Sequence, residues 1–264
     1  MDQTSLQRAL AHLPIPQIRW FQVTPSTNDI ALAWAAAGAP DGALVAADQQ
    51  TRGRGRLNRE WITWPGSALA FSLVLRPNDL CNDMLPRYAL LGGLAVCLAL
   101  EGLKPGCNAK IKWPNDVLLE NHKVCGVLAE AVWSGSSLSA LVLGIGVNVL
   151  PGSTPPPQSV RYRAGNVADL LAIPVDRLQL LGDILDQLFA WRERLQSQEF
   201  LTAWETRLAF RGLQVVLENT SGKRLSGVLE GVSPSGGLSL RLPNGETMEC
   251  LAGDLSLRPG AAIE

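Results

Sequence analysis

The distribution of apolar residues along the chain predicts a fold that mixes helices and strands. A Ser-Thr-Asn-Asp sequence at 26–29 precedes an Ala/Leu/Trp run that ends at Gly38, which is typical of a capped helix. With three further apolar stretches, the expected helices cover 27–37, 86–100, 176–196 and 198–209. Runs rich in Val, Leu and Ala predict buried strands at 42–47, 67–75, 117–119, 124–132 and 138–149. An Asn-His pair at 121–122 marks an expected hairpin turn.

The sequence Pro-Gly-Ser-Thr-Pro-Pro-Pro at 151–157 predicts a surface loop. After residue 210 the pattern of apolar and polar residues changes from helical to β-prone. From 211 to 258, short β-prone runs alternate with Ser-Gly and Asn-Gly turns, which indicates a small β-barrel. We therefore expect a large domain at 1–210 and a barrel at 211–264. A unit of about fifty residues buries little surface, so the barrel should lean on the large domain.

Composition narrows the function classes. The chain has 264 residues, 47% of them hydrophobic, and its net charge of −1 creates no global attraction to nucleic acid or membrane. Five scattered cysteines and only two histidines argue against a structural zinc site and predict reduced thiols in the cytoplasm. The N-terminus lacks the pattern of a signal peptide, and no run approaches the roughly 18 apolar residues that span a bilayer.

A polar loop between the first two expected strands is dense in arginine. Four arginines occupy eight positions, 52–59, with glycines at 53 and 55. Such arginines repel one another unless an anion lies among them, and glycine lets the backbone approach the anion and take positive φ. A solvated loop and a nucleic-acid patch are alternatives, but the chain has no wider basic face. With Trp61 and Trp64 beside it, the loop best fits the phosphate of a nucleotide or an acyl-adenylate.

The segment 112–116, Lys-Trp-Pro-Asn-Asp, is the second unusual sequence. Pro114 keeps Trp113 out of helical geometry, which predicts an extended turn with side chains held at fixed angles. A lysine four residues before an aspartate suits nucleotide chemistry, because the ammonium neutralises phosphate charge and the carboxylate binds Mg²⁺. A structural turn with a surface ion pair is the alternative. Lys123, just past the hairpin turn, is placed to reach the same anion.

Two further motifs are ambiguous by themselves. Residues 144–148, Gly-Ile-Gly-Val-Asn, lack the third glycine of a dinucleotide fingerprint, and no GxxxxGK[ST] sequence occurs, so neither a Rossmann nor a P-loop site is predicted. The glycines instead allow a flat base or a neighbouring strand to approach, with Asn148 available for adenine or ribose. Ser-Thr-Asn at 26–28 is a helix cap whose side chains are also able to bind the ureido oxygen of a ligand.

Taken together and in this order, these segments resemble the biotin–protein ligase family. The match covers nearly the whole chain, at 26–28, 50–61, 112–116, 123, 126–130, 144–148 and 256–258. One such motif arises easily by chance, whereas five in family order do not. The resemblance implies an α+β fold: a mixed sheet flanked by helices, related to class II aminoacyl-tRNA synthetases, with a C-terminal SH3-like β-barrel.

The resemblance also implies a role for each matching position. It implies that biotin contacts Ser26, Thr27, Asn28, Gln50, Gly53, Arg54, Gly55, Arg56, Lys123 and Gly126. It implies that the nucleotide contacts Arg54, Arg59, Trp61, Lys112, Asn115, Asn148 and Arg258. The catalytic residues it implies are Lys112, Arg56 and Arg59, and the Mg²⁺ ligand it implies is Asp116.

The implied reaction has two halves, with ATP and biotin as substrates and Mg²⁺ as the metal. The biotin carboxylate attacks the α-phosphate, and a lysine of a biotin carboxyl carrier domain then attacks the mixed anhydride and releases AMP. No protein nucleophile is required. A lipoate–protein ligase or octanoyltransferase on a related fold is the nearest alternative. A nucleic-acid-binding module without catalysis is an alternative of another class.

Some family members carry an N-terminal winged helix-turn-helix that represses biotin synthesis genes. Here the first motif begins at Ser26, so we predict a monofunctional ligase with no specific DNA binding and no membrane association. Relatives include homodimers joined at sheet edges, which leaves that assembly open for this chain. Arg52 adds a charge for which the pattern predicts no role.

The arginine loop carries a prediction about motion. Because its arginines cannot pack against each other, we expect the loop to be mobile without ligand and to close when biotin or its adenylate supplies an anion. Replacing Arg54 or Arg56 by a small neutral residue should then release the adenylate, which would label lysines of unrelated proteins.

Overall fold

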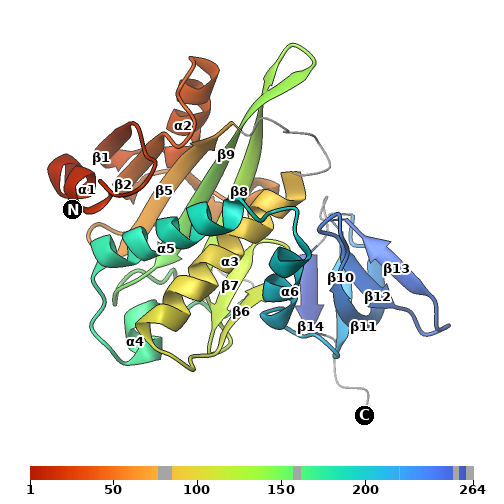
Figure 1. Cartoon of the computed structure of the whole chain (residues 1–264). Helices are drawn as coiled ribbons and strands as arrows, with labels where there is room; N and C mark the ends of the chain where they lie inside the picture. The colour runs from red at the N-terminus through yellow and green to blue at the C-terminus, as the bar shows by residue number, and fades with distance from the viewer. Residues whose placement is uncertain (77–84, 157–161, 220, 252–255, 260–264) are drawn as a thin grey trace.

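A seven-stranded sheet forms the larger body of the protein (Figure 1). The computed structural model describes residues 1–76, 85–156, 162–219, 221–251 and 256–259. The strand order is β1-β2-β5-β9-β8-β7-β6, parallel between β1 and β2 and antiparallel elsewhere. The strands are β1 Ile18–Thr24, β2 Leu44–Gln50, β5 Ala68–Leu75, β6 Ala109–Lys112, β7 Asp116–Leu119, β8 His122–Ser134 and β9 Ser137–Asn148. The sheet is therefore mixed, and the predicted α+β class is confirmed.

Different helices cover the two faces of this sheet. Helices α3 (Leu85–Leu103) and α5 (Arg177–Arg192) cross one face, and α2 (Thr27–Ala36) packs on the other (Figure 1). Alternation along β9 separates the two cores. Leu141 and Leu143 enter the core beneath α3 and α5, whereas Val142 packs with α2. This two-sided burial explains why the strands appear in the sequence as continuous apolar runs.

The sheet face that carries α2 is not covered by helix along its whole length. Gly144 and Gly146 follow Val142 on this face of β9, and both line a cavity. Small residues at these positions leave room above the strands. The functional site occupies that room.

Helix α3 is the central helix of the larger core. Its residues 86–103 are long and apolar enough to cross a membrane by length and composition, so the expectation that no run approaches that length was wrong. However, 67% of this stretch is buried inside the protein. Leu91, Leu94 and Ala95 are fully covered by the sheet and by α5, so the apolar composition is that of a core helix.

Most elements lie where the apolar pattern placed them. The helices expected at 27–37, 86–100, 176–196 and 198–209 are α2, α3, α5 and α6 (Gln198–Thr206), with ends that differ by a few residues. The pattern missed α1 (Gln3–Ala9), α4 (Val167–Leu171), β1 and β6, which are short or half-exposed.

The hairpin turn between β7 and β8 falls one residue earlier than expected. Its two central residues are Glu120 and Asn121, with φ of 47° and 60°. A two-residue turn of this hand needs positive φ at both positions, and asparagine tolerates that region. The pair at 121–122 was therefore wrong by one position, and His122 begins β8.

A five-stranded antiparallel sheet forms the small C-terminal unit, which is SH3-like (Figure 1). Its order is β13-β12-β11-β10-β14. The strands are β10 Gln214–Glu218, β11 Arg224–Val232, β12 Leu238–Arg241, β13 Thr247–Cys250 and β14 Ser256–Pro259. The division of the chain at residue 211 stays a prediction.

The small unit docks through the turn that joins β11 to β12. Arg87 of α3, which is buried, donates from Nε to the carbonyl of Pro234 at 2.7 Å. The indole of Trp113, which is fully buried, donates to the carbonyl of Gly236 at 3.1 Å. Trp113 belongs to the turn between β6 and β7, so the small unit supports the Lys-Trp-Pro-Asn-Asp segment directly.

Candidate functional site

A cavity of about 700 Å³ opens on the α2 face of the sheet, within the usual size range of ligand pockets. All the site residues expected from the sequence line it, except Gly53 and Arg258. Gly53 does not line the cavity but packs against Trp61, where an added Cβ would lie 2.3 Å from the carbonyl oxygen of Trp61. Arg258 lies in β14, and its side chain is outside the described part of the structure.

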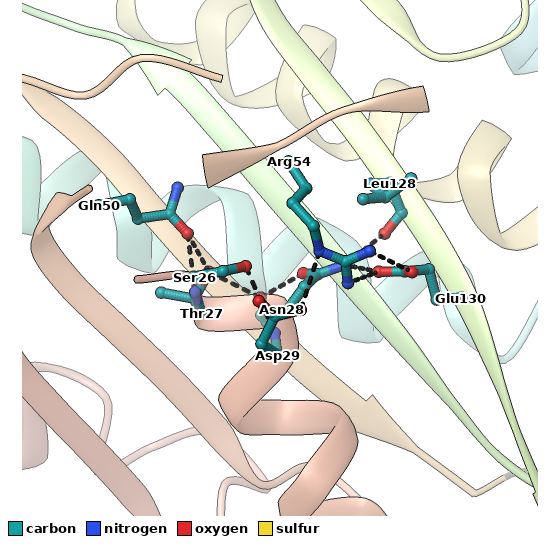
Figure 2. Close-up of polar contacts among 9 residues, drawn as sticks. Ser26, Thr27, Asn28, Asp29, Gln50, Arg54, Leu128 and Glu130 are labelled. Carbon is teal, nitrogen blue, oxygen red and sulfur yellow. Dashed lines mark hydrogen bonds and ion pairs between the residues drawn. The ribbon is translucent and has the colours of Figure 1, made fainter. Parts of the chain in front are cut away.

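One end of the cavity is a network of neutral side chains at the start of α2 (Figure 2). The backbone N–H and the hydroxyl of Thr27 both donate to Gln50 Oε1, at 2.7 and 3.0 Å. The hydroxyl of Ser72 is within 2.5 Å of Asn28 Oδ1. Thr27 and Asn28 are nearly fully buried. A network fixed in this way holds its donors and acceptors in one orientation.

The Ser-Thr-Asn sequence caps a helix and also lines the cavity, while its contact with a ligand stays a prediction. Ser26 caps α2, and its hydroxyl accepts from the N–H of Asp29 at 3.4 Å. Asn28 instead turns toward β9, where an added Cβ on Gly144 would lie 1.9 Å from Asn28 Oδ1. Gly144 is therefore required for Asn28 to reach its position. The cap and the pocket use different side chains of one motif.

The other end of the cavity gathers charge around Asp116. Its Oδ1 lies 2.6 Å from Lys123 Nζ, and its Oδ2 lies 3.6 Å from Lys112 Nζ. Burial alone would raise the pKa of Asp116, but the charges of Lys123 and Lys112 outweigh burial and hold that pKa below its ordinary value. Burial lowers the pKa of Lys112, and the nearby carboxylate only partly offsets this.

Arg56 and Arg59 add positive charge at the same end. Arg56 Nη1 donates to Asn115 Oδ1 at 3.4 Å, and Arg56 interacts electrostatically with both Asp116 and Arg59. Burial lowers the pKa of Arg56 as well, although arginine stays charged at any working pH. Four cationic side chains thus meet around one carboxylate, so this end attracts an anion.

This arrangement fits the expected role of Asp116 as a Mg²⁺ ligand poorly. Both of its oxygens face lysine ammonium groups, which compete with a metal for the same carboxylate. In the described part of the chain, no group of three or more His, Cys, Asp or Glu side chains is placed to hold a metal. Asp116 is better understood as the residue that orients the two lysines.

Two glycines form a flat floor between the ends. Gly126 of β8 and Gly146 of β9 are cross-strand partners. An added Cβ would lie 3.1 Å from the ring of Trp61 at Gly126 and 2.4 Å from it at Gly146. The Gly-Ile-Gly motif was expected to admit a flat base or a strand, and here it admits the protein's own indole. Trp61 Nε1 is buried and has no hydrogen-bond partner in the described structure.

The arginine loop folds as a small β-ribbon over the cavity. Strand β3 (Gly53–Arg54) pairs with β4 (Glu60–Trp61), and a short 3₁₀ turn (Arg56–Asn58) joins them. The expectation that glycines take the positive φ values was wrong. Those values fall on Leu57 and Asn58, at 57° and 56°, while Gly55 is extended at −127°.

Protein carboxylates, rather than a ligand, pair with Arg54 (Figure 2). Glu130 binds its guanidinium through both oxygens, at 2.9 and 2.7 Å, and Asp29 lies 2.8 Å from its Nε. Sequence reasoning missed both acids. Glu130 ends the Gly-Val-Leu-Ala-Glu motif as an acid within an apolar strand, which was the available signal.

The segment after the proline loop closes the cationic end. Ala164 forms a bridge beside Lys123, and the side-chain amide of Asn148 donates to the carbonyl of Gly165 at 3.2 Å. The ring of Tyr162 lies 5.4 Å from Lys112 Nζ. No motif pointed to Tyr162, because its position depends on how this segment docks on β8.

Comparisons with known proteins agree with this architecture. The sequence pattern of the Biotin/lipoate A/B protein ligase family matches residues 20–148. A Biotin--[acetyl-CoA-carboxylase] ligase of Paracoccus denitrificans is 37% identical over 236 residues, which span 84% of this chain and 93% of that protein. One of Mycobacterium tuberculosis is 32% identical over 239 residues, 88% of this chain and 85% of that protein.

A solved structure extends the match to the whole fold. The biotin protein ligase from Aquifex aeolicus, in complex with biotin and ATP, has a TM-score of 0.79 at 30% identity, over 93% of this chain and 100% of that one. The fold is that of a biotin/lipoate-type protein ligase. Within that family, the chain belongs to the biotin–protein ligases. The resemblance inferred from its motifs is confirmed.

Proposed function

We propose that this chain uses ATP to make biotinyl-5′-adenylate and transfers the biotin to a lysine of a biotin carboxyl carrier domain, of the acetyl-CoA carboxylase type. The observation that carries the proposal is one cavity with a neutral hydrogen-bonding end and a cationic end. Strand β8 joins the two ends, since Lys123 and Glu130 are separated by roughly 23 Å of extended chain. An adenylate of biotin has the same order of polarity: a neutral ring, an apolar chain and a phosphate.

At the neutral end, the proposed contacts are to the ureido group of biotin. Hydroxyl and amide groups come from Ser26, Thr27, Asn28 and Gln50. Thr27 and Gln50 hold each other, Ser26 is fixed by the N–H of Asp29, and Asn28 is fixed by Ser72 and Glu130. Beyond these contacts, the Trp61 indole over Gly146 is proposed to border the nucleotide. A site preorganised in this way loses little entropy when the ligand binds.

At the cationic end, charge stabilisation carries the first half-reaction. A carboxylate oxygen of biotin forms a bond to the α-phosphorus as the bond to pyrophosphate breaks. Lys123 binds the carboxylate, Lys112 and Arg56 stabilise charge on the α-phosphate, and Arg59 faces the departing pyrophosphate. Asp116 holds Lys112 and Lys123 in place before the substrate arrives, and closure of the ribbon adds Arg56 and Arg59.

The second half-reaction needs no residue as a nucleophile. The neutral amine of the acceptor lysine attacks the acyl carbon, the bond to AMP breaks, and the amine loses a proton. Asn148 is proposed to face the nucleotide, because its Oδ1 is buried with no hydrogen-bond partner among the described residues. Arg258 keeps its expected role on the ATP side.

Biotin-dependent exchange of labelled pyrophosphate into ATP tests the proposal. We expect exchange with biotin and, at matched concentrations, far less with lipoate or octanoate, which lack a ureido group. Exchange that prefers lipoate or octanoate would assign the chain to the lipoate-type branch. No exchange with any of the three acids would remove the ligase function.

We also propose an acceptor protein and a cell compartment for this chain. The acceptor is a carboxyl carrier domain, and the cell compartment is the cytoplasm, where reduced cysteines are stable. Assembly as a homodimer through sheet edges and the absence of specific DNA binding stay predictions. Sedimentation of the purified protein and a duplex-DNA binding assay at varied salt test them.

A further inference from the structure

We propose that Glu130 is a positioning residue that holds the β3–β4 ribbon closed over the cavity by pairing with Arg54. This inference rests on the proposed ligase function for its consequence, although its structural part stands alone. It also divides the arginine loop between two tasks, in which Arg54 anchors the ribbon and Arg56 faces the anion.

The anchor consists of three charged contacts that join side chains of three elements. Arg54 comes from β3, Glu130 from β8 and Asp29 from the first turn of α2 (Figure 2). The guanidinium meets Glu130 through two parallel hydrogen bonds and turns its Nε toward Asp29 at 2.8 Å. A planar, two-point pairing of this kind constrains direction as well as distance.

Glu130 also contacts the floor of the neutral end. Its Oε2 accepts from Asn28 Nδ2 at 2.8 Å, and Asn28 in turn accepts from the hydroxyl of Ser72. The Glu130 carboxylate therefore joins the ribbon to Asn28, the side chain that is proposed to bind the ureido ring of biotin. A shift of Arg54 is transmitted to Asn28 through a single residue.

Release of Arg54 would free more than one side chain. Gly53, its neighbour, lies against the carbonyl oxygen of Trp61, so the two strands of the ribbon move together. The indole of Trp61 covers the glycine floor, and Arg56 follows Arg54 by two residues. Opening the anchor would expose both the floor and the cationic end.

Partly exposed ion pairs add little to global stability, and Arg54 is 38% exposed here. A lid is a different case, because its open and closed states differ by little free energy. A small change in that difference shifts the open population about tenfold. We therefore expect changes at Glu130 to affect ribbon opening rather than folding.

Limited trypsin digestion of the full chain tests the anchor without any activity, because the ribbon carries its own arginine sites. In Glu130→Gln, the amide oxygen still accepts from Asn28, but the charged pairing with Arg54 is lost. We expect cleavage after Arg56 and Arg59 to be about tenfold faster than in the unmodified protein. The matched control is Arg52→Met, an exposed arginine of the same loop, which should be cut at the normal rate.

A double-mutant comparison separates the anchor from a general loosening. Arg54→Met also loses the contact with Asp29, so if Glu130 acts through Arg54, adding Glu130→Gln to Arg54→Met should open the ribbon no further than Arg54→Met alone. Each variant should also release preformed biotinyl-5′-adenylate about tenfold faster and label lysines of serum albumin. Normal cleavage in Glu130→Gln, or additive effects in the double variant, would overturn the inference. Faster cleavage in a protein that makes no adenylate would keep the anchor and remove the ligase function.

Discussion

The two ends of the cavity achieve binding in opposite ways. At the neutral end, Thr27 donates to Gln50, and the hydroxyl of Ser72 contacts both Thr27 and Asn28, so shape and donor direction select the ligand. At the cationic end, Lys112 and Lys123 compete for one carboxylate. The neutral network is satisfied without ligand, whereas the cationic cluster carries excess charge that an anion would neutralise.

The difference between the two ends indicates that stability and function conflict at the cationic end. Buried hydrogen-bond networks contribute to the unique fold when every member has a partner. Burying a charge costs folding free energy, as the pKa of Lys112, which is lowered mainly by burial, indicates. Removing a group from the neutral end should therefore cost stability, and removing one from the cationic end should cost mainly activity.

The largest effect is expected for Lys112→Met. Losing one preorganised charge at the α-phosphate should slow pyrophosphate exchange by roughly a hundredfold. Stability should move the other way. Because burial lowers the pKa of Lys112 below its unfolded value of 10.5, its charge is destabilising at pH 7, and Asp116 keeps Lys123 as a partner. The Tm should thus rise by about 2 °C.

The neighbouring lysine supplies a matched control for that variant. Lys110 lies on the same face of β6 as Lys112, and its Nζ donates to the carbonyl of Thr206 at 3.4 Å. Lys110→Met should leave exchange unchanged. A Lys112 variant with normal exchange, or a marked loss of Tm with the loss of activity, would contradict the comparison of the two ends.

Asp116→Asn is expected to have the next largest effect. Lys112 and Lys123 lose the carboxylate that orients them, so exchange should fall roughly tenfold or more. The Mg²⁺ concentration for half-maximal activity should stay the same, since Asp116 is paired with lysines. A Mg²⁺ curve shifted to higher concentration would instead identify Asp116 as a metal ligand, as the sequence suggested.

The same variant should change the dependence of stability on pH. The folded pKa of Asp116 is held below its unfolded value of 3.8, so its contribution is fully present above that value. It is lost as pH falls through the lower folded pKa. Asp116→Asn should therefore show a shallower loss of stability in acid, measured by urea unfolding between pH 5 and 2.

Substitution of two glycines on one face of β9 gives the most direct comparison of the two ends of the cavity. Gly144→Ala would place a Cβ 1.9 Å from Asn28 Oδ1, and Gly146→Ala would place one 2.4 Å from the Trp61 ring. We expect about a tenfold rise in KM for biotin in the first and for ATP in the second. Gly102→Ala is the control, because an added Cβ there meets nothing within 4 Å. A rise in the same KM in both variants would show that the ends are not separate.

The smallest effect is expected where the small unit supports the cationic end. Trp113→Phe keeps most of the ring but loses the buried hydrogen bond to the carbonyl of Gly236. The free energy of unfolding should fall by about 1–2 kcal/mol, and exchange should slow a few-fold as the turn loosens. Trp133→Phe, at a tryptophan that is 51% exposed, should change neither quantity.

Much of the site was predictable because its chemistry depends on residue types at short spacing. The Lys-Trp-Pro-Asn-Asp turn, the Ser-Thr-Asn cap and the arginine loop each act through residues close together in the chain. Strand alternation then brings Asn148 to the same face as Gly146, whereas a β-bulge in the pairing of β7 with β8 lets Lys123 and Gly126, three residues apart, line the same cavity. The apolar pattern predicted the main helices for the same reason, since its period is local.

Contacts across long sequence separations depended on the tertiary structure. Glu130 meets Arg54 across 76 residues, and Trp113 meets Gly236 across 123. No local pattern specifies such pairs, because they follow from strand register and from how the small unit docks. The same applies to the positive φ of Leu57 and Asn58, which the ribbon requires of its turn.

The amino-acid sequence by itself therefore determined the chemistry that this protein carries: its charges, its glycines and the order of its motifs. The tertiary structure decided where each of those charges lies. Arg54 and Arg56 are equivalent in sequence, yet Arg54 pairs with Glu130 and Asp29 near the neutral end, whereas Arg56 lies beside Asn115 and Asp116 at the cationic end. Pairing depends on distance, and distances between remote residues exist only after the sheet has formed.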